Sequence, residues 1–189
     1  MSPKLFRCSG GEVLWPARGL VLVSRHDGGN LIVNPQQDVW ERSELTPLEL
    51  TQWSFLVAAL ATAMLNVLPQ LQSGCINYWE AGHWSLNRAA EPAGHKTAPE
   101  FHRVHMHLLG CSPASSSPSM QWGEAPEFPA VADRHQWAAS HERLIAAECV
   151  RIVTAAAARL TAFYGMNETG LAPWSVCEVC GYPTVPEPA

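Results

Sequence analysis

Residues 102–109, HRVHMHLL, alternate between polar and apolar side chains, and this alternation constrains the fold more than any other stretch of the chain. Successive side chains of a β-strand point to opposite faces of a sheet. Arg103, His105 and His107 therefore share one polar face of a predicted strand. His102 falls on the opposite face, whose other side chains are apolar and suited to a core.

Other short strands are predicted on both sides of this one. Residues 19–34 contain two β-rich runs around a glycine-containing turn at 27–29, a pattern typical of a hairpin. Shorter runs with strand composition lie at 12–15, 75–79 and 84–87. These segments are too short to be independent units, so we expect them to join the histidine strand in one sheet.

Two helices are predicted. The residues TPLE at 46–49 supply a capping threonine, a proline at the first helical position and a glutamate that can complete a capping box. This helix should run to about Leu68, and its apolar later half should be packed on both sides. The second helix is predicted over 133–163, with Gly165 as its stop. Its expected apolar stripe comprises Trp137, Leu144, Ile145, Val150, Val153, Leu160 and Phe163.

The order of strands, helix, strands, helix indicates an α+β fold with an antiparallel sheet and packed helices. Residues 111–131 are rich in Ser and Pro and predict a long irregular loop, of the kind that often forms a lid, an arm or an insertion. The chain of 189 residues favours one domain, over 1–165, followed by an irregular tail over 166–189.

Charge and hydropathy exclude several kinds of protein. A net charge of −5 disfavours generic binding of duplex nucleic acid, which needs a basic face. The apolar run at 54–68 is shorter than the ~20 residues of a membrane span, and the first residues lack the apolar core of a signal peptide. We therefore expect no membrane association, a cytoplasmic location and reduced cysteines.

The polar face of the histidine strand offers groups suited to phosphoryl or nucleotidyl transfer. An imidazole can act as a nucleophile or a general base near neutral pH. An arginine beside it can pair with a phosphate through two hydrogen bonds. Arg103, His105 and His107 are therefore the candidate catalytic residues, although a polar strand face open to solvent would show the same pattern.

Three stretches, in this order, resemble the histidine-triad (HIT) superfamily. They are GGNLIVNPQQDVWERSELTPLEL (28–50), which leads into the first helix, CINYWEAGHW (75–84), and RVHMHLLG (103–110). The resemblance covers roughly residues 19–110. It implies a HIT-like domain in which the middle histidine of a triad attacks an α-phosphate and forms a covalent nucleotidyl-histidine, which water or another acceptor then resolves.

The resemblance places His105 at the nucleophile's position and His107 at the third triad position. The first triad position, usually histidine, is Arg103, which stays charged and cannot accept a proton. Asp38 and Asn30 also stand where the superfamily usually has histidine. An ion pair or hydrogen bond from Asp38 to Arg103 or His105 is therefore conceivable.

Further residues are candidates for substrate binding. By analogy with the superfamily, Asn77 should contact the phosphate or the leaving group, and Asn30 and Asn34 should line the nucleoside pocket or make ordinary strand hydrogen bonds. Lys96, followed by Thr97, lies in a glycine-flanked loop that could touch a phosphate or simply be solvated. His83 (in EAGH, 80–83) could join the site or belong to an exposed turn.

The tail contains Cys177 and Cys180 at the spacing of a zinc-binding pair. One such pair supplies two ligands, whereas a structural zinc site needs about four. A structural zinc completed by Cys8 and a histidine, and a reduced metal-free pair, are both open. The proposed chemistry itself requires no cofactor.

The sequence thus supports three interpretations. The first is a nucleotide hydrolase or nucleotidyl transferase acting on a nucleotide or nucleotide conjugate. The second is a nucleotide-binding protein without catalysis, and the third is a divergent enzyme of a specialised pathway that uses the same pocket. The resemblance also implies a homodimer, with the apolar helix around 54–68 as a candidate interface.

Overall fold

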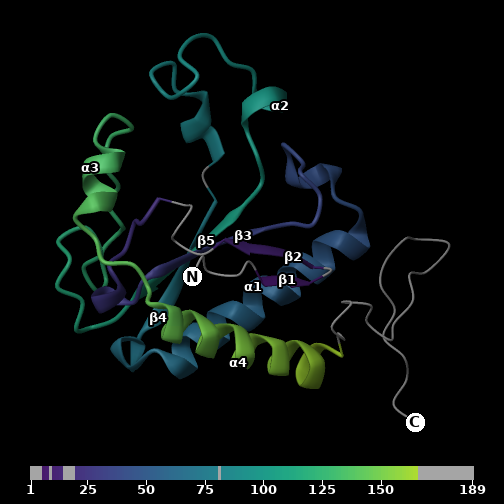
Figure 1. Ribbon diagram of the computed structural model, residues 1–189, viewed down its shortest axis with the longest axis vertical. Coiled ribbons are helices and arrows are strands. Elements are labelled where there is room, and N and C mark those ends of the chain that lie inside the picture. Colours follow the sequence, from purple (N-terminus) through teal and green to yellow (C-terminus); the bar gives the residue numbers. More distant parts are fainter. Residues whose placement is uncertain (1–5, 9, 15–19, 81, 166–189) are drawn as a thin grey trace.

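Five strands form one antiparallel sheet in the order β1-β2-β3-β5-β4 (Figure 1). The computed structural model describes residues 6–8, 10–14, 20–80 and 82–165. The strands are β1 (Phe6–Cys8), β2 (Gly11–Leu14), β3 (Asn30–Asn34), β4 (Cys75–Trp79) and β5 (Met106–Cys111). The antiparallel sheet and its helices confirm the predicted α+β class.

Two long helices cover one face of the sheet. Helix α1 (Pro47–Val67) packs against the strands, and α4 (Ala146–Tyr164) packs against α1, as Figure 1 shows. The core between them combines strand residues such as Val33 and Leu108 with Leu60 of α1 and Ile152 of α4. The opposite face of the sheet is therefore left for other segments of the chain.

Helix α1 begins as the sequence predicts. Thr46 accepts a hydrogen bond from the Glu49 N–H at 3.3 Å, and the Glu49 carboxylate accepts from the Thr46 N–H at 2.9 Å, which completes a capping box. The helix ends at its C-cap residue Leu68, just before Pro69. By length and composition α1 could cross a membrane, but the core helix of a globular protein meets the same criteria, and α1 has its apolar residues against the sheet and α4.

The predicted hairpin at 19–34 is wrong. Only its second half is a strand, and β3 pairs with β2 and β5 instead. In the described part of the first half, the backbone N–H groups of Leu22 and Val23 bond to the Asn30 side chain, and the Arg25 N–H bonds to the Glu142 carbonyl. These bonds replace the strand pairing that a hairpin would need.

Three further strand predictions differ from the structure in their bounds or in their secondary structure. The segment predicted as a strand at 84–87 lies mostly within a 3-10 helix, η4 (Gly82–Leu86), which the Asn87 N–H continues by bonding to the Trp84 carbonyl. The strand predicted over 12–15 is β2, and Trp15 lies outside the described residues. The histidine strand begins at Met106 rather than at His102. Residues 102–105 connect the short helix α2 (Ala98–Phe101) to the strand without belonging to either, and the Val104 N–H bonds to the Val39 carbonyl instead of to a neighbouring strand.

The predicted helix over 133–163 is two helices, α3 (Arg134–Ala139) and α4. The Ser140 hydroxyl bonds to the Trp137 carbonyl at 2.7 Å and helps to end α3. The predicted apolar stripe is wrong in part, because Ile145, Val150 and Phe163 are exposed. The buried positions of α4 are Glu148, Cys149, Ile152, Ala156 and Leu160. The predicted stop is confirmed, since Gly165 follows α4 in the left-handed conformation with φ of 64°.

No helix or strand lies between Ser112 and Asp133, so the irregular loop is confirmed. The loop packs across the sheet face opposite α1. Met120 joins a second apolar cluster with Leu22, Val23, Leu109 and Cys111, and Phe128 packs against that cluster. The loop therefore covers part of the sheet face on which the candidate site lies.

Candidate active site on the histidine strand

His107 lies near the start of β5 and His105 just before it, both on the face away from α1. In the sheet, His107 is opposite Ile32 on β3 and Trp79 on β4. Val104 and Leu108 belong to the core beside α1, and Met106 packs against it. The predicted alternation of faces is therefore correct from Val104 onwards, and it brings the two histidines together.

The two imidazoles form a directly hydrogen-bonded pair. Their Nε2 atoms are 3.0 Å apart, and the rings meet edge to face with centroids 4.8 Å apart. Nδ1 of His105 lies 2.8 Å from the Arg103 carbonyl oxygen. A carbonyl can only accept, so Nδ1 of His105 carries the hydrogen. In the neutral pair, Nε2 of His105 is then the acceptor and Nε2–H of His107 the donor.

His107 occupies an apolar environment. Its side chain is 6% exposed, and the Trp79 ring lies 5.1 Å away between centroids. Its Nδ1 is buried and has no hydrogen-bond partner among the described residues. Burial, and secondarily the neighbouring His105, lower the pKa of His107 from 6.5 to about 3. His107 is therefore neutral at physiological pH.

Arg103 contributes its backbone carbonyl to the histidine pair, while its side chain points to other partners. Its Nε lies 2.9 Å from Oδ1 of Asp38, and Nη1 donates to the Pro99 carbonyl at 3.0 Å. The conceivable Asp38–Arg103 ion pair is thus present, at an exposed position. His102 lies apart from the pair, with Nδ1 bonded to the Trp40 carbonyl.

Asn30, Asn34 and Asn77 share the sheet face of the histidines. Asn30 is buried, and its amide bonds to the backbone of Leu20, Leu22 and Val23, so its polar atoms are engaged within the fold. Asn34 ends β3 next to the Val33–Met106 pair, and Asn77 is opposite Leu109. Both are half-exposed and remain available to a ligand.

Lys96 is held by the loop in which it lies. Its Nζ donates to the carbonyls of Asn87 at 2.9 Å and Ala90 at 2.6 Å, so it organises residues 87–96. Thr97 bonds to Glu100 at 2.6 Å. His83 is exposed within η4. None of these contacts brings Lys96, Thr97 or His83 to the histidine pair.

An aromatic wall beside His107 is the main feature that the sequence did not assign. Trp79 stacks on Phe128 with centroids 4.0 Å apart and contacts Trp84 edge-on at 5.2 Å. The strand position of Trp79 and the high tryptophan count were available signals. No sequence signal predicted that Phe128 takes part, because it lies in the irregular loop and its sequence neighbours show no periodicity.

Among residues 6–8, 10–14, 20–80 and 82–165, no group of three His, Cys, Asp or Glu side chains could hold a metal ion. Cys177 and Cys180 lie outside these ranges, so the predicted zinc pair stays a prediction. Cys75, Cys111 and Cys149 are free thiols. Neither the family models nor the curated proteins include a match to this chain.

Proposed function

We propose that the protein is a HIT-like enzyme that acts at the α-phosphate of a nucleotide or nucleotide conjugate, with His105 as the nucleophile. The observation that carries the proposal is the hydrogen bond from Nδ1–H of His105 to the Arg103 carbonyl. This bond fixes the tautomer in which Nε2 holds the lone pair, so that the nitrogen facing His107 is the reactive one.

The proposed reaction has two steps. The lone pair of His105 Nε2 attacks phosphorus, the bond to the leaving group breaks, and the leaving group departs with a proton from solvent. Water or another acceptor then attacks the nucleotidyl-histidine, loses a proton, and releases the nucleotide while His105 regains its lone pair. As substrate enters, the Nε2–H of His107 turns from His105 to a phosphate oxygen.

Arg103 plays a different part in this proposal from that of a phosphate-binding arginine. Its carbonyl orients the nucleophile, and its side chain is paired with Asp38. The amide groups of Asn34 and Asn77 are the proposed donors to the substrate. A neutral, buried His107 suits a donor of one hydrogen bond, since its low pKa keeps it from becoming an imidazolium.

A second candidate function is nucleotide binding without turnover. The engagement of the Arg103 side chain by Asp38 and the Pro99 carbonyl favours it, because a guanidinium held by these partners is not directed at a phosphate beside His105. The third interpretation, an enzyme with an unusual substrate, is favoured by the long loop that places Phe128 beside the site.

Turnover with a substrate panel distinguishes these functions. The panel contains adenosine and guanosine 5′-phosphoramidates and dinucleoside polyphosphates, tested with wild type, His105→Ala and the exposed control His83→Ala. We expect wild type and His83→Ala to turn over at least one substrate, and His105→Ala to be slower by at least about 10³-fold. Binding without turnover in wild type would favour the non-catalytic function, and equal rates in His105→Ala would exclude the nucleophile assignment.

A further inference from the structure

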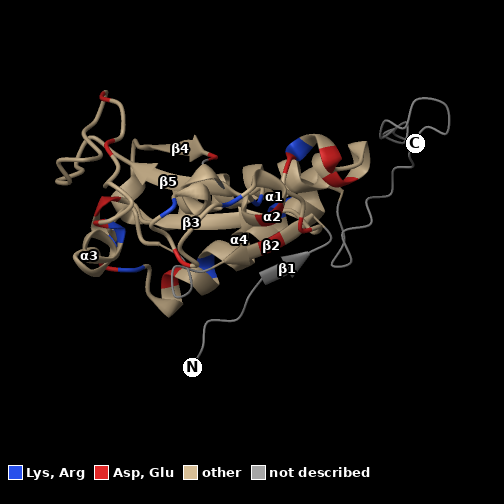
Figure 2. Cartoon of the chain, turned by 90° about the horizontal axis from the view of Figure 1, so that it is seen from above, with Lys and Arg blue, Asp and Glu red and all other residues tan. Residues whose placement is uncertain are grey.

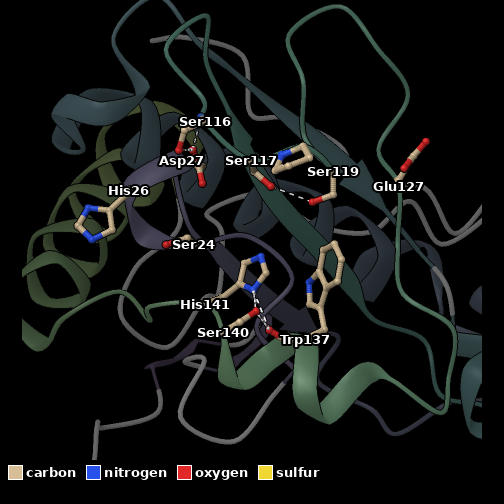
Figure 3. A pocket seen from close by; sticks show the side chains of 11 residues that line it. Ser24, His26, Asp27, Ser116, Ser117, Ser119, Glu127, Trp137, Ser140 and His141 are labelled. Carbon is tan, nitrogen blue, oxygen red and sulfur yellow. Dashed lines mark hydrogen bonds between the residues drawn. The ribbon is translucent and has the colours of Figure 1, made fainter.

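A cavity lies away from the histidine pair, between the irregular loop and the end of α3 (Figure 3). Its volume is about 490 Å³, within the range of small-molecule sites. Neither His105 nor His107 lines it. Its walls come from three segments and comprise Ser24, His26, Asp27, Ser116, Ser117, Pro118, Ser119, Glu127, Trp137, Ser140 and His141.

The charges of the described lining disfavour an anionic ligand. Asp27 and Glu127 carry carboxylates, and the lining residues that the structure describes include no lysine or arginine. The nearby Arg25 is engaged by Glu148 at 2.9 Å, and His26 by Glu142 at 3.0 Å. A phosphate or carboxylate entering the cavity would therefore meet negative charge without a compensating cation. The proposed histidine site, in contrast, would bind a negatively charged nucleotide phosphate.

Asp27 holds the loop in place and fixes a negative charge in the wall. Its side chain is buried, and Oδ1 accepts hydrogen bonds from the Ser116 N–H at 2.7 Å and the Ser115 and Ser116 hydroxyls at 3.2 Å each. The cavity wall is thus organised before any ligand arrives, which lowers the entropic cost of binding.

His141 presents a hydrogen-bond acceptor on the opposite wall. Its Nδ1 lies 2.8 Å from the Trp137 carbonyl, so Nδ1 carries the hydrogen and Nε2 of the neutral ring is left as an acceptor. Figure 3 shows the His141 ring turned from α3 toward the serines across the cavity. The ring stacks on Trp137 at 5.0 Å between centroids, which fixes both orientations.

The remaining polar groups are serine hydroxyls, which can both donate and accept. Ser117 and Ser119 are joined by a hydrogen bond of 2.8 Å, so one of the two hydroxyls can donate to a ligand. Carboxylates and the His141 Nε2 accept only. The lining as a whole is rich in acceptors and matches a ligand with several O–H or N–H donors and some apolar surface for Trp137 and Pro118.

We propose that this cavity is a binding site for a small hydroxyl-rich molecule without negative charge, of the monosaccharide or amino-sugar class. Monosaccharides and amino sugars share the hydroxyl donors that the lining recognises, and they differ only in an ammonium group. The proposal is independent of the nucleotide chemistry at His105, because the two sites share no residue.

The test is ligand-observed NMR by saturation transfer on the full chain, followed by titration calorimetry. The panel holds common neutral hexoses and pentoses, their 2-amino derivatives, and the corresponding 6-phosphates or 5-phosphates. We expect a neutral sugar or an amino sugar to bind, and its phosphate to bind at least about tenfold more weakly. Preference for amino sugars would assign the Asp27 charge to the ammonium group, and equal binding would assign recognition to the hydroxyls.

Variants locate the binding. His141→Ala and Ser119→Ala should each weaken it about tenfold. His135→Ala, at an exposed position of α3, and His105→Ala should not change it. Asp27→Asn keeps an oxygen acceptor for the loop and should weaken amino sugars more than neutral sugars. Absence of binding by every neutral and amino sugar in the panel, tighter binding of the phosphates, or binding unchanged in both His141→Ala and Ser119→Ala would overturn the proposal.

Discussion

At the residue scale, the reactivity of the candidate site depends on one backbone carbonyl. The hydrogen bond from His105 to the Arg103 oxygen does not use the Arg103 side chain, so histidine or arginine at this position can supply it equally. Under the proposed function, an arginine at position 103 would therefore be compatible with a correctly oriented nucleophile at His105. The ion pair to Asp38 keeps the arginine side chain on the surface.

The low pKa of His107 predicts a pH dependence of stability. Its pKa is 6.5 when unfolded and about 3 when folded, so below pH 6.5 the unfolded state binds a proton that the folded state does not. The stabilising contribution is complete above pH 6.5 and is lost as the pH falls, by up to about 1.4 kcal/mol per pH unit. Urea unfolding at pH 7 and pH 5 should show this loss in wild type but not in His107→Asn. The same pH dependence in both proteins would contradict a neutral buried His107.

Residue-scale predictions from the sequence were strongest where strand alternation applied. It put His105 and His107 together, whereas His102 lies apart because it precedes the strand and bonds to the Trp40 carbonyl. It could not predict that Asn30 bonds to the preceding backbone or that Lys96 is held by two carbonyls, because these contacts depend on where irregular segments return in space.

At the element scale, the start of α4 depends on Glu148. This buried carboxylate accepts from the Ile145 N–H at 2.9 Å and pairs with Arg25 on the segment before β3. Burial acts to raise the pKa of Glu148, but the hydrogen bonds from Arg25 and the Ile145 N–H outweigh it and leave the pKa lowered. The helix start is therefore tied to a segment more than a hundred residues earlier.

Removing this carboxylate should destabilise the protein. Glu148→Ala deletes the helix cap and leaves Arg25 without its closest anion, so we expect a loss of about 2–3 kcal/mol in the free energy of unfolding at pH 7. Because the pKa of Glu148 is lowered, the difference should shrink as the pH falls below 4.5. Glu142, with a side chain 66% exposed, also faces Arg25, and Glu142→Ala should cost less than about 1 kcal/mol. Equal losses in the two variants, measured by urea unfolding, would contradict this account.

The irregular loop is coupled to the histidine strand through Phe128. Phe128→Ala removes the stack on Trp79 and should cost about 1–3 kcal/mol, with a change in the NMR shifts of the His107 ring. Trp122, which is 48% exposed in the same loop, provides the control, and Trp122→Ala should change stability by less than about 0.5 kcal/mol. An unchanged His107 spectrum in Phe128→Ala would show that the aromatic wall does not reach the site.

Elements with strong local signals were predicted well, and those defined by distant contacts were not. The capping box and Pro69 delimited α1, and Gly165 ended α4. The break between α3 and α4 contains no glycine or proline that could have predicted it. It is formed by the Ser140 hydroxyl bond and by the backbone bond between Arg25 and Glu142. For the same reason the hairpin prediction failed, because β-rich composition at 20–24 was overridden by the Asn30 side chain.

At the scale of the whole molecule, the sheet separates the hydrophobic core from the candidate site. One face carries the core with α1 and α4, and the other carries the histidine pair and the loop. In the view of Figure 2, lysines and arginines of the described residues are interspersed along the chain with aspartates and glutamates. If both proposals hold, the cavity beside α3 and the histidine pair would recognise ligands of different charge.

The expected homodimer is also tested at this scale. Helix α1 is largely taken up by α4 and the sheet, which leaves the edge strand β4 as the more accessible surface, with Tyr78 55% exposed. Light scattering after gel filtration should give twice the 20.7 kDa chain mass. Tyr78→Glu should produce the monomer, whereas Val150→Glu on the exposed face of α4 should not. A monomeric wild type would exclude the dimer.

The most direct test of the central claim is mass spectrometry of the protein during turnover. After rapid mixing with adenosine 5′-phosphoramidate and quenching at alkaline pH, peptide mapping should show an adenylyl group on His105. The adduct should be absent in His105→Ala and present in His83→Ala. An adenylyl group on any other residue, or turnover without an adduct on His105, would contradict the claim that His105 is the nucleophile.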